Sequence, residues 1–210
     1  MRKETKDSSV LLVQALGEGE WAVRWDFKPK LNEHREETGV NWYEEEIFFH
    51  IPELDEIKEA ITNWQNRQTD AAILHGFRWQ DMMVWLSMEN QFNYKSVFDL
   101  ATMTGQAIAA WDAEHPDLAG HEFIHRDVTT EDATTLTVPV PTGRPREVLP
   151  VTFKFGTDEE PQYHEFTTLE ELTEFYTSCM SYIQGCYQSG WQKKDNFDYV
   201  PYEEAIRLVL

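Results

Sequence analysis

The sequence predicts an α+β fold in which two β-hairpin-plus-helix units pack in one core. The order of signals hairpin, capping residue, helix occurs twice, at residues 77–104 and 151–190. A run of alternating apolar residues before position 28 predicts an N-terminal β extension. Residues 106–147 interrupt the pattern, so we expect a long central insertion there.

The N-terminal region, residues 1–51, is expected to form a tail and a β extension. After a polar start and an edge strand, the residues with apolar side chains stand at every second position: Trp21, Val23, Trp25 and Phe27. This period is typical of a strand with one buried face. Residues 28–39 are charged and rich in turn formers, and the β-prone run 40–51 follows them. The two strands are expected to pair antiparallel.

The first helix of the α+β domain, residues 52–210, is expected directly after Pro52. Its apolar residues keep helical spacing up to Trp64, and acidic side chains near its start suit the positive end of a helix. His75-Gly76 ends this region. One helix is therefore predicted between residues 52 and 76.

The first hairpin is expected over residues 77–86, with a tight turn at Gln80-Asp81. Ser87 follows as a candidate N-cap residue. The next helix carries an apolar stripe within residues 94–101, and Gly105 is expected to stop or break it.

The second hairpin-plus-helix unit follows the insertion at 106–147, which is rich in proline and expected to form an extended arm. Two β-prone runs within residues 148–166 predict its hairpin. Thr168 opens a capping-box sequence, and the helix is expected to continue to about Gly190. A short last helix is predicted at 201–208.

The charge of the chain excludes two classes of partner. Lys and Arg number 18 and Asp and Glu 38, which gives a net charge of −20 at pH 7. We therefore expect no nucleic acid and no membrane insertion. The apolar run 10–13 is too short for a signal peptide or a membrane span, which predicts synthesis in a cytoplasm. Cys179 and Cys186 lie about 10.5 Å apart along one helix face, so we expect two free thiols.

The strongest catalytic motif is His121-Glu122-Phe123-Ile124-His125, which matches HExxH. On a helix, two such histidines share a face and bind zinc while the glutamate activates a water. The segment is rich in aromatic and β-branched residues, which favours a strand or loop and makes the match a chance one. His121 and His125 are zinc candidates only if the segment is helical. We expect no enzyme activity, no catalytic residue, no metal and no cofactor.

Eight tryptophans are more than a core of this size requires. Core packing is the first interpretation, protein-interface anchoring the second, and stacking on sugar rings the third. The tryptophans with a candidate structural or interface role are Trp21, Trp25, Trp42, Trp79, Trp85 and Trp111.

The segment around the second helix start is the most specific in the chain. Asn90 and Gln91 precede the apolar stripe by one turn, and buried amides must be hydrogen-bonded. They are therefore expected to pin the helix start to the backbone of the preceding hairpin. Ser87 and Asn93 belong to the same run and are structural candidates with them.

This run resembles a domain family of unknown function that recurs in tailed bacteriophages and prophages, often in tail-fibre-type proteins. The strings that carry the resemblance are GFRW at 76–79, VWLSMENQFNYK at 84–95, PVTFKFG at 150–156, YHEFTTLEELTEFYT at 163–177 and GWQKKD at 190–195. The resemblance covers about 57–105 and 149–202, and 106–147 look like an insertion relative to shorter members. Asp81 stands where members tend to have Gly. The resemblance implies a phage structural context and no reaction.

We therefore expect a non-enzymatic structural component of a tailed-phage virion, in the tail, a fibre or another appendage, that acts through protein–protein contacts. The expected partners are other phage structural proteins and further copies of the chain in a homo-oligomer. The expected location is the virion, after synthesis in the host cytoplasm. Two alternatives stay open: a glycan-binding module for host recognition, and an assembly chaperone for the fibre.

Overall fold

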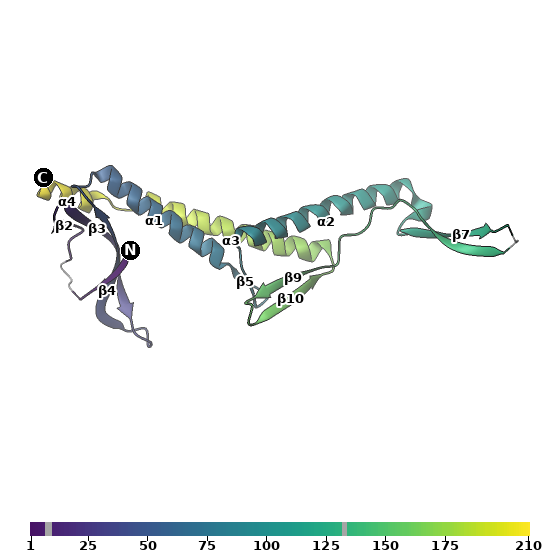
Figure 1. The fold of residues 1–210 in the computed structure, drawn as a ribbon, viewed down its shortest axis with the longest axis horizontal. Coiled ribbons are helices and arrows are strands. Elements are labelled where there is room, and N and C mark those ends of the chain that lie inside the picture. The colour runs from purple at the N-terminus through teal and green to yellow at the C-terminus, as the bar shows by residue number, and fades with distance from the viewer. Residues whose placement is uncertain (7–9, 132–133) are drawn as a thin grey trace. The chain divides into compact units, whose positions relative to one another are not determined.

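The computed structural model describes residues 1–6, 10–131 and 134–210, and its helices and small antiparallel sheets confirm the α+β prediction (Figure 1). The chain divides into two compact units. Unit 1 comprises Met1–Ala71 with Tyr187–Leu210, and unit 2 comprises Ala72–Cys186. No helix within the described ranges is both long and apolar enough to cross a membrane.

Unit 1 is built on one four-stranded antiparallel sheet. Its strands, in the spatial order β1-β4-β3-β2, are β1 (Arg2–Thr5), β2 (Val13–Gly17), β3 (Glu20–Leu31) and β4 (Glu37–Phe48). The pairing of β3 with β4 confirms the two antiparallel strands expected from the sequence.

The helices of unit 1 supply the rest of its core. They are α1 (Leu54–His75) up to Ala71, the end of α3 (Leu169–Asp195) from Tyr187, and α4 (Val200–Val209). Trp25 of the sheet, Ile61 of α1 and Tyr202 of α4 belong to one buried cluster. The expected segment 1–51 thus shares its core with helical residues that the sequence assigned to the domain 52–210.

The expectation that β3 buries a single face as far as Phe27 was wrong. Asp26 has a positive φ of 55°, and the register with β4 shifts between Trp25 and Lys28, which is a β-bulge. Phe27 is 39% exposed beyond the bulge, and its ring stacks on Tyr43 at 5.5 Å between ring centroids. The other face of β3 is buried too, since Arg24 is only 6% exposed.

Unit 2 places two hairpin-plus-helix units around one core, as expected. The first consists of β5 (Phe77–Trp79), β6 (Met82–Val84) and α2 (Met88–Glu114), and the second of β9 (Val151–Gly156), β10 (Pro161–Phe166) and α3. Their aromatic rings meet at centroid distances of 5.0–6.3 Å between Trp79, Tyr94, Phe153, Phe155, Phe166 and Phe175. One aromatic cluster therefore joins both hairpins to both helices.

Both expected glycine stops were wrong. α2 continues through Gly105 to Glu114, and α3 continues through Gly190 to Asp195. A glycine within a helix costs only about 1 kcal/mol relative to alanine. In α2 the alanine-rich residues 106–113 favour continuation, and so the first part of the expected insertion is helical.

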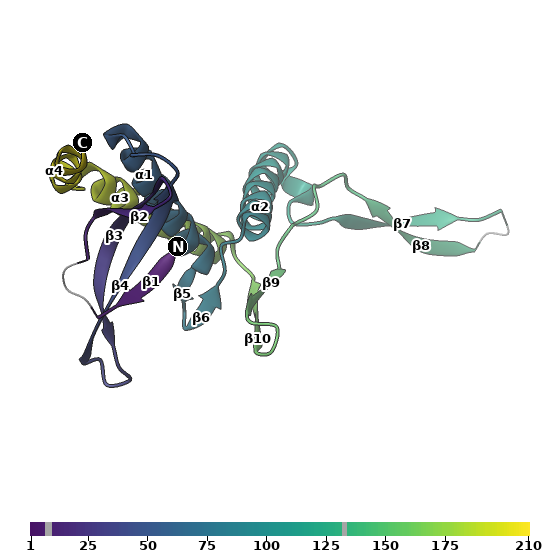
Figure 2. The same cartoon turned by 60° about the vertical axis from the view of Figure 1, so that its left-hand side comes forward.

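The rest of the insertion forms an arm in unit 2. After the short 3₁₀ helix η1 (Pro116–Leu118), β7 (Phe123–Thr129) and β8 (Thr135–Pro141) pair antiparallel (Figure 2). Most described residues of this hairpin are exposed. The Arg144 guanidinium, in the segment after it, binds both carboxylate oxygens of Asp112 on α2, at 2.8 and 3.0 Å. That ion pair holds the base of the arm to the helix.

Candidate functional site

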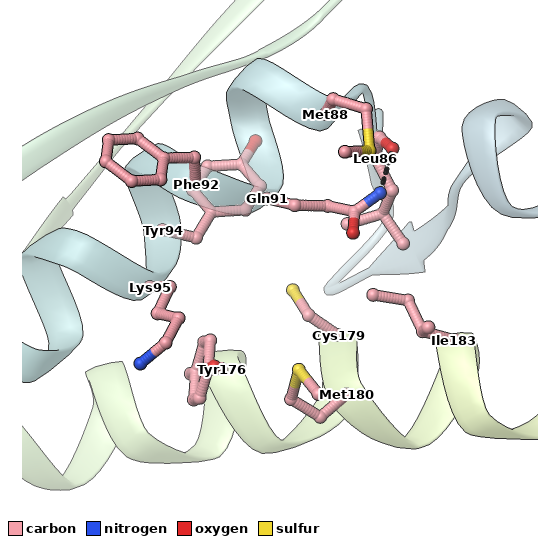
Figure 3. Close-up of a pocket in the computed structure, with 10 residues that line it drawn as sticks. All are labelled: Leu86, Met88, Gln91, Phe92, Tyr94, Lys95, Tyr176, Cys179, Met180 and Ile183. Atoms are coloured by element: carbon pink, nitrogen blue, oxygen red, sulfur yellow. Dashed lines mark hydrogen bonds between the residues drawn. The ribbon is translucent and has the colours of Figure 1, made fainter.

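A cavity of about 350 Å³ lies in unit 2, between the start of α2 and the middle of α3. Figure 3 shows side chains from the two helices facing each other across it. We call it the α2–α3 cavity, and it is lined by Leu86, Met88, Gln91, Phe92, Tyr94, Lys95, Tyr176, Cys179, Met180 and Ile183. This volume falls in the range of small-ligand pockets and of the grooves that receive apolar side chains.

Three polar side chains fix the start of α2, which forms one wall of the cavity. The Ser87 hydroxyl oxygen accepts a hydrogen bond from the Asn90 backbone N–H at 3.2 Å. The side-chain amides of Asn90 and Gln91 donate to the carbonyl oxygens of Trp85 and Leu86, at 3.0 and 2.7 Å. The N-cap prediction and the predicted pinning of the helix start are both confirmed.

The rim of the cavity is apolar and exposed. Met88 is 78% exposed, Phe92 74% and Met180 46%. Methionine side chains adapt to differently shaped partners, and clustered exposed apolar groups mark interaction sites. Lys95 is the charged residue of the lining, and its ammonium binds the Asp99 carboxylate at 2.5 Å. The hydrogen bond to Asp99 raises the pKa of Lys95, so its charge stays paired.

The floor of the cavity is buried and chemically inert. Burial raises the pKa of the Cys179 thiol to about 12, and it also raises that of the Tyr94 hydroxyl. Both groups are therefore protonated at neutral pH, and a protonated thiol is a poor nucleophile. The cavity can receive apolar groups but offers no activated nucleophile at Cys179.

The apolar surface extends beyond the cavity along α2. Leu100 and Met103 are exposed on this helix, while Tyr94 and Ala101 are buried in the core. At 100° per residue, Met103 lies about 180° around the helix axis from Tyr94. α2 therefore has one apolar face in the core and a second one in solvent, the exposed stripe Met88, Phe92, Leu100 and Met103.

The predicted interface tryptophans do not gather at this site. Trp25 and Trp79 are core residues, and Trp85 donates through its indole nitrogen to the Gly156 carbonyl oxygen at 2.7 Å. The remaining candidates are partly buried or, for Asn93, exposed: Trp21, Trp42, Trp111 and Asn93. The Arg2 guanidinium lies 4.7 Å above the Trp42 ring, and Trp111 stacks on His115 at 4.5 Å.

The sequence reasoning missed Met88, Phe92 and Met180, the residues that form the rim. For Met88 and Phe92, the available signal was a second apolar stripe on α2, opposite the one assigned to the core. One apolar face is sufficient to explain a packed helix, so the second stripe alone does not predict a partner.

The HEFIH segment is not helical. β7 begins at Phe123, so His125 lies on a strand and His121 precedes it. The two histidines therefore do not share a helix face, as a zincin requires. Among the described residues, no group of three or more His, Cys, Asp or Glu side chains is arranged to hold a metal ion.

No protein-family model matches the chain, and neither a curated protein nor a solved structure matches it.

Proposed function

We propose that the chain is a non-enzymatic structural component of a tailed-phage virion that acts through protein–protein contacts. The observation that carries the proposal is the exposed apolar rim of the α2–α3 cavity with its continuation along α2. These large apolar side chains surround a hollow and are exposed to solvent. Covering them with a partner lowers the free energy, because apolar surface is removed from water.

The partner we propose for this surface is an apolar segment of another structural protein of the particle. Like charges repel, so a chain with a net charge of −20 favours a partner that is not strongly acidic over the further copies of itself that the sequence led us to expect. The four side chains of the stripe are apolar, and of the two acidic residues on the same side of α2, Glu89 and Asp99, the second is paired with Lys95. The position of the stripe opposite the core face lets α2 bind a partner without rearranging the core.

The resemblance of residues 57–105 and 149–202 to a phage and prophage domain family supports the virion as the location. It leaves a fibre assembly chaperone as the alternative. The two differ in whether the protein stays in the finished particle.

Mass spectrometry of purified particles tests the location. We expect the chain among the virion proteins, in a constant ratio to another tail or fibre protein. If the chain occurs in the lysate and is absent from purified particles, the virion proposal is wrong and the chaperone is favoured.

A photo-cross-linking amino acid at Phe92 tests the contact surface. We expect Phe92 to cross-link to another virion protein. The matched control is the same amino acid at Tyr163, an aromatic of similar exposure on β10 that lies outside the cavity lining. Equal cross-linking from both positions would contradict the assigned surface, and cross-links only to a second copy would contradict the assigned partner.

A further inference from the structure

The arm of unit 2 is a hairpin without a third strand. β7 and β8 form a two-stranded sheet, and among the described residues no other strand pairs with either of them. The ion pair between Arg144 and Asp112 fixes the base of this hairpin to α2 (Figure 2). A two-stranded hairpin is marginally stable by itself in water, and stable sheets have at least three strands or a covering layer. The arm is therefore an incomplete sheet.

The two faces of the arm differ in polarity. Side chains alternate between the faces of a strand, and the apolar ones occupy most even-numbered positions. Val128 and Leu136 lie directly opposite each other on this face and are 44% and 50% exposed. The partly buried side chains of the same face are Ile124, Val138 and Val140. Strands added beside the hairpin would extend this apolar face and cover part of it.

The hydrogen-bonding pattern determines which backbone groups face the outer edges of the arm. The Thr142 N–H donates to the Glu122 carbonyl oxygen, and the Thr130 N–H to that of Thr134, both at 2.9 Å. In an antiparallel ladder, bonded pairs alternate with unbonded pairs. These bonds at the two ends of the hairpin mean that the even-numbered residues bond across the ladder. The odd-numbered residues therefore direct their N–H and C=O groups outward.

Proline blocks one of the two edges. Two of the outward-facing residues of β8 are Pro139 and Pro141, which have no N–H. Proline on an edge strand hinders further pairing. The outward-facing residues of β7 all retain the N–H, and they are Phe123, His125, Asp127 and Thr129. β7 is thus the open edge of the arm.

The sequence of β7 is complementary to itself in the antiparallel direction. Because odd-numbered residues face outward, two β7 strands pair with odd residues opposite odd ones. Pairing over the full length then places the central residue, Arg126, on the two-fold axis. His125 lies opposite Asp127 of the second copy, and an imidazole N–H can donate to a carboxylate. Ile124 lies opposite Val128 of the second copy, which joins the two apolar faces.

We propose that the arm binds the arm of a second copy of the chain, with the two β7 strands paired antiparallel about Arg126. The product is a four-stranded sheet in the order β8-β7-β7-β8, and both of its outer edges carry the prolines of β8. Since these edges are blocked, assembly stops at two copies. The inference goes beyond the proposed function, because it concerns another element and another partner than the α2 stripe.

The net charge of the chain opposes this association, but the arm carries little of it. Of the net charge of −20, β7 and β8 contain only the opposite charges of Arg126 and Asp127. In about 0.5 M NaCl, the repulsion between the copies is screened beyond roughly 4 Å. The interface is small, so we expect a weak dimer with a dissociation constant of roughly 10–100 μM at this salt concentration.

Sedimentation equilibrium of the full chain in about 0.5 M NaCl tests the proposal. Asp127→Pro removes an outward N–H of β7, and we expect it to weaken the dimer about tenfold or more. Thr137→Pro is the matched control, because it places proline directly opposite, on the edge that is already blocked. Both variants remove the same hydrogen bond, 2.6 Å long, from the Thr137 hydroxyl to the Asp127 carboxylate. The control should change the dissociation constant by less than about twofold.

Three results would overturn the proposal. The first is a wild-type chain that stays monomeric at about 0.5 mM, as it would if β7 paired only with a strand of another protein. The second is an unchanged dimer in Asp127→Pro. The third is equal weakening by Asp127→Pro and Thr137→Pro.

A cysteine on the two-fold axis provides a second readout if Asp127→Pro fails to fold. Arg126 and its copy form an unbonded pair, whose Cα atoms lie about 4.5 Å apart, within the disulfide range of about 4.4–6.8 Å. In a Cys186→Ser background, which removes the partly exposed native thiol, diamide should oxidise Arg126→Cys to a linked dimer. Val138→Cys, opposite Arg126 on β8, is the control and should stay unlinked. No linkage in Arg126→Cys, or equal linkage in both variants, would overturn the proposal.

Discussion

The indole N–H of Trp85 donates a hydrogen bond of 2.7 Å to the carbonyl oxygen of Gly156. Trp85 follows the first hairpin and Gly156 ends β9, so this bond joins the two hairpin-plus-helix units across 71 positions of sequence. Gly156 has a φ of 78°, and a Cβ atom there would overlap the Glu160 carbonyl oxygen. A directed bond thus adds to the aromatic packing between the two units.

Replacing Trp85 by Phe removes this donor while keeping an aromatic ring. We expect a loss of about 1–3 kcal/mol in unfolding free energy, because the Gly156 carbonyl loses its partner. Urea denaturation measures it. Trp111→Phe is the matched control and should change stability by less than about 0.5 kcal/mol. Equal midpoints for wild type and Trp85→Phe would contradict the assigned role.

Two glycines of α3 provide a matched pair of substitutions. A Cβ atom added at Gly185 would have nothing within 4 Å, so Gly185→Ala should gain up to about 1 kcal/mol from helix propensity. Gly190→Ala should lose about 1–2 kcal/mol, because its methyl group overlaps Thr69. Thermal unfolding distinguishes them, and Thr69→Ala should restore part of the loss. If both alanines stabilise the protein, α1 and α3 can move apart at Gly190 without a loss of stability.

Glu45 makes the stability of unit 1 depend on pH. Burial raises the pKa of this carboxyl, but hydrogen bonds from Lys3 and Arg24 outweigh it, so the pKa lies below its usual value of 4.5. A lowered pKa in the folded state stabilises the protein above pH 4.5, and this contribution disappears as the pH falls through the lowered value.

Glu45→Gln should therefore cost about 3 kcal/mol near neutral pH, since it leaves Arg24 buried without its carboxylate partner. The difference from wild type should shrink as the pH falls below 4.5. Denaturation curves over a pH series measure it. Glu46→Gln, at an exposed neighbouring position, is the control and should show no comparable loss. A pH-independent difference would contradict the assignment to the ionised carboxylate.

The two thiols should react at different rates. Cys179 is 2% exposed and its pKa is raised to about 12, whereas Cys186 is partly exposed. At about pH 8, iodoacetamide should alkylate Cys186 and spare Cys179 until the protein unfolds. Peptide mass spectrometry measures both sites, with a urea-denatured sample as the control. Comparable labelling of both cysteines in the folded protein would show that the cavity floor opens.

Local signals predicted much of this fold. The capping residues Ser87 and Thr168, with the alternating and helical periods beside them, located the hairpins and the helices that follow. The amides of Asn90 and Gln91 were also predicted correctly, because their partners lie on the adjacent backbone.

Features that depend on distant parts of the chain were not predicted. The bulge at Asp26 redirects Phe27, and the alternating pattern alone does not reveal it. Gly190 was expected to end the helix. A glycine is needed there because Thr69 of α1 approaches too closely for a Cβ atom. The periodicity of a helix identifies an apolar stripe but not whether the core or a partner covers it.

The core of unit 1 is assembled from both ends of its sequence. Trp25 and Ile61 belong to the same buried cluster as Tyr202, whose hydroxyl donates to the Arg24 carbonyl oxygen at 3.0 Å. During synthesis, at roughly 5–20 residues per second, the ribosome needs about 7–30 s to travel from Ile61 to Tyr202. All of unit 2 is translated in that interval. Unit 2 therefore has the opportunity to fold first, while the core of unit 1, with Trp25 against α1, still lacks Tyr202 of α4.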